Sequence, residues 1–265
     1  MKKKVLITLG CSFTQGDGCY DYSLIDTEFN GKPYHEFTEE DKSKFWQLNE
    51  PRFLEYGWPS KLQEKLGYDE LYNLGFGGAA ISHSIKILLD KFYYKDFSDC
   101  DVLLVHMLSF PDRISFFSNS KIKTFRIGSK LHQEYIKEIK GLGLDIHGNA
   151  DDTTLEGYFY VKILKELCAN KGWNFLFCSA RGDEDTHMDH YRDKELISNN
   201  FMRVGSIINM SNKELLSKIC GHPNEDGYLA IADTLFSYIK ENHSEVKIGT
   251  ATEFKKEYVR PIPFE

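Results

Sequence analysis

A chain of 265 residues, 41% hydrophobic and 28% charged, has the composition of an ordinary globular protein and the length of one large α/β domain or two small ones. Its formal net charge of −7 disfavours nucleic acid as the main partner, because phosphate binding needs a basic face. No apolar run reaches the roughly 18 residues that span a bilayer, and the run after the N-terminal lysines is too short for a secretory signal. We therefore expect a cytoplasmic protein that binds neither nucleic acid nor membrane.

Six cysteines are scattered through the chain without any C-x-x-C spacing. This pattern predicts neither a zinc ribbon nor a redox pair, and we expect no cofactor. Reduced thiols are the default in a protein of this size without an export signal.

The first part of the chain predicts two strands and a helix around a long insertion. Apolar runs bounded by glycine predict buried strands at residues 4–9 and 70–74. Between them, residues 17–56 are irregular, polar and aromatic, so we interpret them as an insertion, helical at 39–48, that forms one wall of a cleft. A further helix is expected at 58–66, with a proline in its first turn and a glycine after its end.

The rest of the chain continues this alternation of strands and helices. Apolar periodicity predicts the following elements: helices at 79–92, 153–169, 212–219 and 224–241, and strands at 101–108, 173–178 and 206–210. Alternation of this kind implies a three-layer α/β/α sandwich with a central parallel sheet of about five strands. We predict a single domain over residues 1–265, with a C-terminal extension at 247–265 that wraps the surface.

The segment after the first strand carries a candidate nucleophile, Ser12. In open parallel sheets, ligands bind at the carboxyl ends of the strands, so a serine just past such an end is placed to meet a substrate. Taken alone, the serine is more simply explained as the cap of the following helix.

Three motifs together resemble the SGNH, or GDSL, hydrolase superfamily. Residues 10–16 (GCSFTQG) are similar to its first block, residues 73–78 (NLGFGG) to its second, and residues 221–224 (GHPN), followed by an apolar helix, to its fifth. Their order and strand context cover most of residues 4–241. The resemblance implies the SGNH-hydrolase fold, which is flavodoxin-like, and the transfer of an acyl group to water.

The same resemblance assigns roles to three residues. Ser12 would be the nucleophile and His222 the base that removes its proton and later protonates the leaving alcohol. The backbone N–H groups of Ser12 and Gly75 would hold the tetrahedral oxyanion.

The sequence departs from the family pattern at two functional positions. The aspartate that orients the histidine is replaced by Ile219. A carboxylate from elsewhere, a backbone carbonyl or water could take its place, and the candidate carboxylates are Asp183, Glu184 and Asp185. The asparagine that donates to the oxyanion is replaced by Phe110, and Ser109 or Arg113 is the hypothetical substitute donor. Loss of such a donor costs about a hundred- to a thousand-fold in rate. The first block also has Cys11 where the family has aspartate.

Three functions therefore remain open. The first is a serine esterase that cleaves a small O-acyl ester, such as an O-acetyl group on a carbohydrate; its partner is a small-molecule or glycan acyl ester. The second is a catalytically degenerate binding or structural module with the same fold. The third is an O-acyltransferase, in which a sugar hydroxyl replaces water. The sequence leaves the oligomeric state undetermined.

Other candidate sites have simpler explanations. His187, Asp189 and His190 are metal-ligand types, but their spacing favours an exposed acidic loop. His106 lies within an apolar strand and is expected to be a core histidine. The aromatic residues of the insertion either face a carbohydrate or pack against one another, and packing is favoured; they are Tyr20, Tyr22, Phe29, Tyr34 and Phe37.

Overall fold

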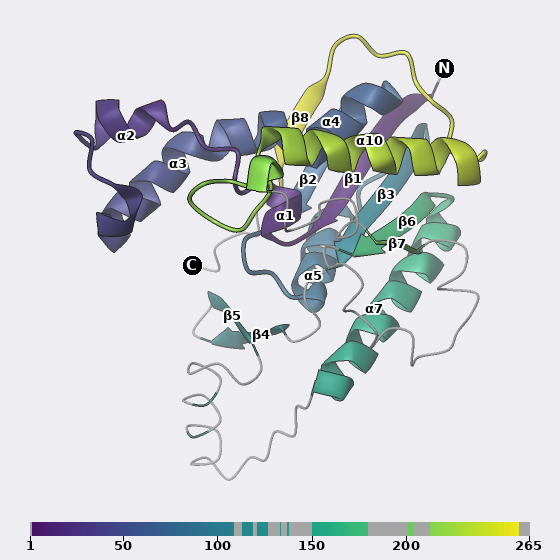
Figure 1. Ribbon diagram of the computed structural model, residues 1–265. Coiled ribbons are helices and arrows are strands. Elements are labelled where there is room, and N and C mark those ends of the chain that lie inside the picture. Colours follow the sequence, from purple (N-terminus) through teal and green to yellow (C-terminus); the bar gives the residue numbers. More distant parts are fainter. Residues whose placement is uncertain are drawn as a thin grey trace.

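The computed structural model describes residues 2–108, 113–118, 121–126, 133, 137, 150–179, 201–203 and 213–259. Its core is a six-stranded sheet in the order β7-β6-β3-β1-β2-β8, and every pairing in it is parallel (Figure 1). The strands are β1 (Lys3–Gly10), β2 (Glu70–Gly75), β3 (Cys100–Leu108), β6 (Asn174–Ser179), β7 (Phe201–Arg203) and β8 (Lys255–Tyr258). Because β1 lies between β2 and β3, its carboxyl end is in the middle of the sheet.

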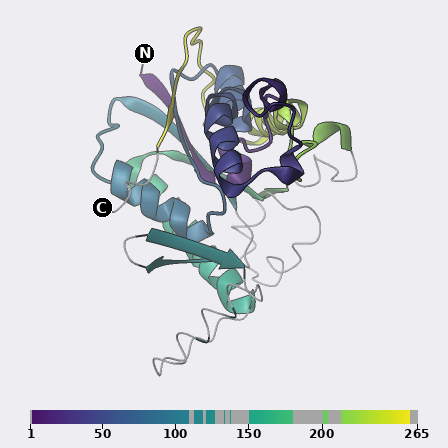
Figure 2. The ribbon, with the colours of Figure 1, turned by 90° about the vertical axis from the view of Figure 1, so that its left-hand side faces the viewer.

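Helices cover both faces of this sheet, which confirms the predicted three-layer α/β/α fold. On one face lie α3 (Glu39–Tyr56), α4 (Trp58–Leu66) and α10 (Glu225–Asn242); on the other lie α5 (Ile81–Phe92) and α7 (Ala150–Lys171) (Figures 1 and 2). Leu6 belongs to the first core cluster, whereas Val5 and Ile7 belong to the second. This alternation follows from the period of two in a strand, and it explains why β1 is apolar on both faces.

The C-terminal extension does more than wrap the surface. Residues 255–258 form β8, which pairs with β2 as a sixth strand at the edge of the sheet. Glu70, on β2, pairs with Lys3 at 2.8 Å and with Lys255 at 3.1 Å. One carboxylate therefore bridges the cationic side chains of both neighbouring strands.

The insertion at 17–56 is more helical than its sequence predicts. It contains α2 (Ser23–Glu28), a short 3₁₀ helix (Tyr34–Glu36) and α3, which begins at Glu39 as predicted but continues to Tyr56 through an internal proline. Its aromatic rings pack mainly around Phe45, which contacts Tyr20, Phe29, Tyr34 and Phe37. These contacts support packing as the role of the aromatic group. Beyond the proline of α3, Phe53 packs on Tyr20 and Trp46, so aromatic contacts span the point where the helical hydrogen bonds are interrupted.

Two other segments differ from expectation. The expected helix at 212–219 is only a 3₁₀ turn, η3 (Lys213–Leu215), because the following residues loop back and hydrogen-bond to η3 and to one another. An antiparallel hairpin, β4 (Arg113–Ser118) and β5 (Lys121–Arg126), follows β3 and was not predicted. The strand expected at 206–210 lies outside the described residues. None of the helices in the described part of the chain is both long and apolar enough to cross a membrane.

Candidate active site

Ser12 lies at the carboxyl end of the central strand β1 and is 4% exposed. The strand ends at Gly10, and Ser12 begins the single-turn helix α1 (Ser12–Gln15). A Cβ on Gly10 would lie 2.1 Å from Thr14 Oγ1 and 2.8 Å from the Met107 carbonyl oxygen. Only glycine fits there, so the tight exit from β1 fixes where the serine is presented.

His222 reaches this serine from the far end of the chain. Its Nε2 lies 2.7 Å from Ser12 Oγ, across 210 positions of sequence. The ring packs on Phe13, with 5.1 Å between centroids. The two residues assigned to nucleophile and base by the motifs are thus hydrogen-bonded to each other.

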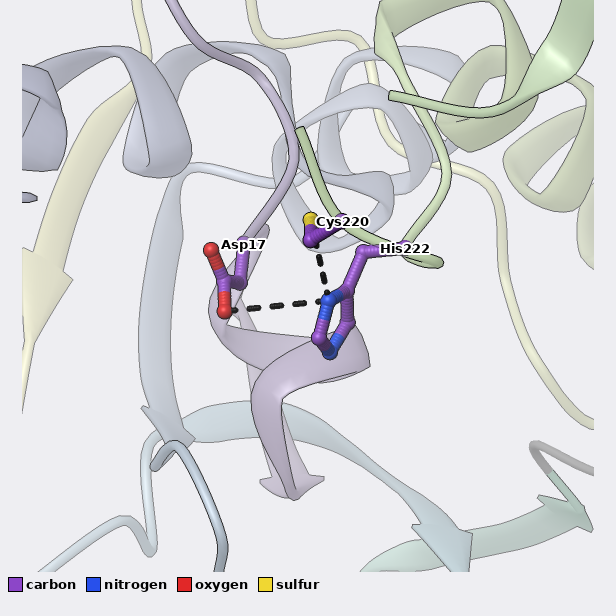
Figure 3. A group of neighbouring side chains, drawn as sticks. All are labelled: Asp17, Cys220 and His222. Atoms are coloured by element: carbon purple, nitrogen blue, oxygen red, sulfur yellow. Dashed lines mark hydrogen bonds and ion pairs between the residues drawn. The ribbon is translucent and has the colours of Figure 1, made fainter. Parts of the chain in front are cut away.

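The other ring nitrogen, Nδ1, faces two groups that the motifs did not identify (Figure 3). Asp17 Oδ2 lies 3.8 Å from it and Cys220 Sγ lies 3.2 Å from it. Asp17 is held in turn by Tyr20, whose hydroxyl donates to Oδ1, and by Tyr228, whose hydroxyl donates to the Asp17 backbone oxygen at 2.7 Å. A carboxylate therefore lies beside the histidine although position 219 is isoleucine.

The loop that carries His222 is fixed by contacts with the insertion. Tyr22 Oη lies 3.0 Å from Ser217 Oγ and accepts a hydrogen bond from the Lys218 backbone N–H, also at 3.0 Å. The Ser217 N–H donates to the His222 carbonyl oxygen at 2.9 Å and closes the loop. Gly18 lies beneath the loop, because a Cβ there would be 2.2 Å from the Pro223 carbonyl oxygen and 3.0 Å from His222 Cβ.

The second glycine motif supports the serine from β2. The Asn73 side chain donates to the Thr14 carbonyl oxygen at 2.9 Å and accepts from the Gly75 N–H at 2.8 Å. A Cβ on Gly75 would lie 2.5 Å from the Gln15 backbone nitrogen. The Gly75 N–H is thus already engaged by Asn73, whereas Ser12, as the first residue of α1, has an N–H without an intrahelical partner.

Burial controls the protonation of the groups around the site. It raises the pKa of the Cys220 thiol, so this group is protonated at neutral pH. Burial, reinforced by the nearby Asp17 carboxylate, also raises the pKa of Tyr20, which therefore stays a hydrogen-bond donor to that carboxylate.

His106, on β3, is fully buried without a hydrogen-bond partner among the described residues, and burial lowers its pKa to about 3. It is a neutral core histidine.

Several predicted residues lie outside the described part of the chain: Ser109, Phe110, Asp183, Glu184, Asp185, His187, Asp189 and His190. Arg113 is the first residue of β4, and its backbone alone is described.

The sequence reasoning missed Asp17 and Cys220. The sequence places Asp17 at the start of the insertion and Cys220 among six cysteines without paired spacing, so neither pattern marks a catalytic role. The available signal was the Gly-Asp-Gly run at 16–18, immediately after the nucleophile motif. With Asp17, Cys220 and His222, the described residues offer three potential metal-ligand atoms within 4.8 Å of one another.

Comparisons with solved structures agree with this fold, whereas comparisons of the sequence found no match. No family model matches the chain, and no curated protein matches it in sequence. Among solved structures, a carbohydrate esterase described as having divergent catalytic and non-catalytic binding functions superposes with a TM-score of 0.52 at 12% identity, over 92% of this chain and 70% of that one.

Two more structures are assigned to the lipolytic G-D-S-L family. The one from Desulfitobacterium hafniense DCB-2 has a TM-score of 0.47 at 12% identity and covers 88% of this chain and 98% of its own. The one from Veillonella parvula DSM 2008 has a TM-score of 0.43 at 11% identity and covers 89% and 98%.

Proposed function

From this divergent SGNH-hydrolase-like fold, we propose that the protein is a serine esterase that cleaves a small O-acyl ester by Ser12–His222 catalysis. The observation that carries the proposal is the 2.7 Å contact between Ser12 Oγ and His222 Nε2 at the carboxyl end of the central strand. A buried serine oxygen hydrogen-bonded to an imidazole is the arrangement that nucleophilic acyl transfer requires.

The first half of the reaction acylates the serine. His222 Nε2 takes the proton from Ser12 Oγ as the oxygen attacks the ester carbonyl carbon. The tetrahedral intermediate then collapses, the bond to the alcohol breaks, and the imidazolium returns its proton to the leaving oxygen. Water repeats the sequence on the acyl-serine and releases the carboxylic acid.

Asp17 supplies the charge that the missing upstream aspartate would have supplied. Its carboxylate, 3.8 Å from Nδ1, stabilises the imidazolium that forms during each proton transfer. In the tautomer that accepts the serine proton, Nδ1 carries the hydrogen and points toward Cys220 Sγ and Asp17. We propose Asp17 as the third member of the catalytic group, in place of Asp183, Glu184 or Asp185.

The oxyanion is held by backbone donors. The N–H of Ser12 is the first donor. The Gly75 N–H is the second donor. It bonds to Asn73 Oδ1 in the free protein and donates to the oxyanion when the substrate oxygen displaces or shares that bond. The described residues place no asparagine side chain in the position of the third family donor, so we expect slow turnover and propose Ser109 or Arg113 as an auxiliary donor.

The similarity to a structure described as a carbohydrate esterase supports a sugar ester as the substrate, and an O-acetyl group on a sugar is the first ester to test. Transfer to a sugar hydroxyl uses the same acyl-serine, so products are analysed with and without an added acceptor alcohol. Transfer gives a new ester, whereas hydrolysis gives only free acid.

The decisive experiment is labelling with a fluorophosphonate probe, which reacts only with an activated serine. We expect labelling of the wild-type protein and none of Ser12→Ala, together with a loss of acetyl-ester hydrolysis of about a thousand-fold or more. Ser60→Ala, at another buried serine, in α4, is the matched control. Unlabelled wild-type protein would instead favour the binding module.

A further inference from the structure

We infer that Asp17, Cys220 and His222 form a binding site for a thiophilic divalent cation, Zn²⁺ above all, and that this cation switches the esterase off. The binding site itself is independent of the proposed function, but the inhibition rests on it. Both the binding site and the inhibition depend on one feature: Asp17 and Cys220 lie beside Nδ1 of His222, whereas Ser12 is bonded to Nε2.

The ligand atoms are already close to the spacing of a zinc site. Nδ1 of His222 lies 3.2 Å from Cys220 Sγ and 3.8 Å from Asp17 Oδ2, and all three atoms lie within 4.8 Å of one another (Figure 3). Tetrahedral zinc with its usual bond lengths separates such atoms by roughly 3.3 to 3.6 Å. Small side-chain rotations therefore suffice to bring all three onto one ion.

The donor set selects the kind of metal. One sulfur, one nitrogen and one oxygen suit Zn²⁺ and Co²⁺, whereas Mg²⁺ and Ca²⁺ require oxygen ligands throughout. A thiolate and a carboxylate together balance the two charges of the ion, so the occupied site is neutral. Three protein ligands leave the fourth tetrahedral position to water.

The surroundings allow entry and already orient one ligand. The His222 and Asp17 side chains are 23% and 18% exposed, so the site is not sealed from solvent. Tyr20 donates to the other carboxylate oxygen, Oδ1, which leaves Oδ2 toward the ring. Such an outer hydrogen bond is typical of carboxylates that ligate metals.

Metal binding and base catalysis make opposite demands on the imidazole. A metal on Nδ1 needs the lone pair of that nitrogen, so the single proton of the neutral ring must move to Nε2. Nε2 then donates to Ser12 Oγ and has no lone pair to accept the serine proton. Binding also releases the Cys220 thiol proton to solvent, and the bound ion removes Asp17 from its role beside Nδ1.

The site is tested by spectroscopy that needs no turnover. Purified, reduced protein is titrated with Co²⁺, which reports thiolate ligation through a ligand-to-metal charge-transfer band. We expect that band in the wild-type protein, its displacement by Zn²⁺, and its loss in Cys220→Ser. Cys100→Ser, a change at the other partly exposed thiol, should retain the band. No band, or a band that survives Cys220→Ser, would overturn the site.

Folding of the variants is checked by circular dichroism, and His222→Gln serves as a second variant should Cys220→Ser unfold. Asp17→Asn should weaken Co²⁺ binding by about ten- to a hundred-fold, because it removes a charged ligand.

The inhibitory part is tested separately. Zn²⁺ at saturating concentration should abolish fluorophosphonate labelling of Ser12, and a chelator should restore it. A cobalt band with unchanged labelling in Zn²⁺ would overturn the inhibition but keep the site. A cobalt band in a protein that is never labelled would instead reject the proposed esterase.

Discussion

The two halves of the candidate site are held in place by different means. The serine side consists of β1, α1 and the end of β2, where backbone groups pack within 3 Å of the space that a side chain on Gly10 or Gly75 would fill. The histidine side is the loop at 217–223, held by side-chain contacts from the insertion, chiefly those of Tyr22 and Asp17. Backbone packing therefore fixes the nucleophile, whereas the base depends on side chains of the insertion in addition to the close backbone approach at Gly18. Substitutions on the histidine side should consequently lower activity most, whereas substitutions on the serine side should mainly lower the free energy of unfolding.

Among substitutions that keep both the nucleophile and the base, the largest effect is expected for Asp17→Asn, which removes the charge beside Nδ1 while keeping an oxygen for Tyr20. An imidazolium without its carboxylate is poorly stabilised, and the corresponding loss in a serine protease is about ten-thousand-fold in kcat. Asp17 Oδ2 lies 3.8 Å from Nδ1, beyond hydrogen-bond distance, so we expect a smaller loss in acetyl-ester hydrolysis, about a hundred- to a thousand-fold, with the free energy of unfolding nearly unchanged. Asp26→Asn, an exposed carboxylate in α2, is the control. An effect of only a few-fold would mean that another group orients His222.

Next in size is a pair of glycine substitutions that separates the two sides. In Gly18→Ala the new Cβ collides with the Pro223 carbonyl and displaces the histidine loop, so activity should fall by about a hundred-fold or more, which corresponds to about 3 kcal/mol. In Gly75→Ala the Cβ presses on the backbone of α1, and we expect the free energy of unfolding to fall by about 1–3 kcal/mol.

Denaturant titration and ester kinetics on both variants give the comparison. Gly221→Ala is the matched control, because a Cβ at that loop position meets no atom within 4 Å. Equal losses of activity per unit of lost stability in Gly18→Ala and Gly75→Ala would contradict the distinction between the two sides.

The central sheet contains a buried histidine, His106 on β3, from which we expect the free energy of unfolding to depend on pH in acid. The pKa of His106 is lowered from 6.5 to about 3 by burial, so below pH 6.5 the unfolded chain takes up a proton that the folded chain does not. This histidine therefore contributes stability that is complete above pH 6.5 and is lost by about 1.4 kcal/mol per pH unit as the pH falls toward 3.

His106→Leu should remove this contribution to the pH dependence. The difference in unfolding free energy between variant and wild type, measured by denaturant titration at pH 7, 6, 5 and 4, should shift in favour of the variant at low pH. His83, whose pKa is lowered to about 4 by burial, is left in place and gives a residual slope. Parallel curves for the two proteins would show that His106 does not titrate with unfolding.

The smallest effect is expected for Tyr22→Phe. This change deletes a hydroxyl that contacts Ser217 and Lys218, and one such hydrogen bond contributes about 1 kcal/mol. A loosened histidine loop should lower kcat by about three- to ten-fold and leave KM unchanged. Tyr94→Phe, at a ring that is 91% exposed, should change neither constant. A change in KM alone would indicate that Tyr22 contacts substrate rather than the loop.

Much of the fold could be predicted from the sequence because its signals are local. The apolar runs at β1 and β3, the glycine after α4 and the proline in its first turn each depend on neighbouring residues, and the structure has those elements where the pattern indicates them. The extension of α3 past its proline could not be predicted, because Phe53, which lies beyond the proline, packs on Tyr20, a residue distant in sequence. The edge strand β8 likewise forms only because β2 offers it a partner.

By itself, the sequence determined the alternation of strands and helices and the presence of a serine and a histidine in motifs at opposite ends of the chain. Only the tertiary structure decided that an aspartate and a cysteine, 203 positions apart (220 − 17), converge on Nδ1 of His222. The physical reason is that sequence patterns report interactions over a few residues, whereas a site at the edge of a parallel sheet is assembled by crossovers and loop contacts with no local signature.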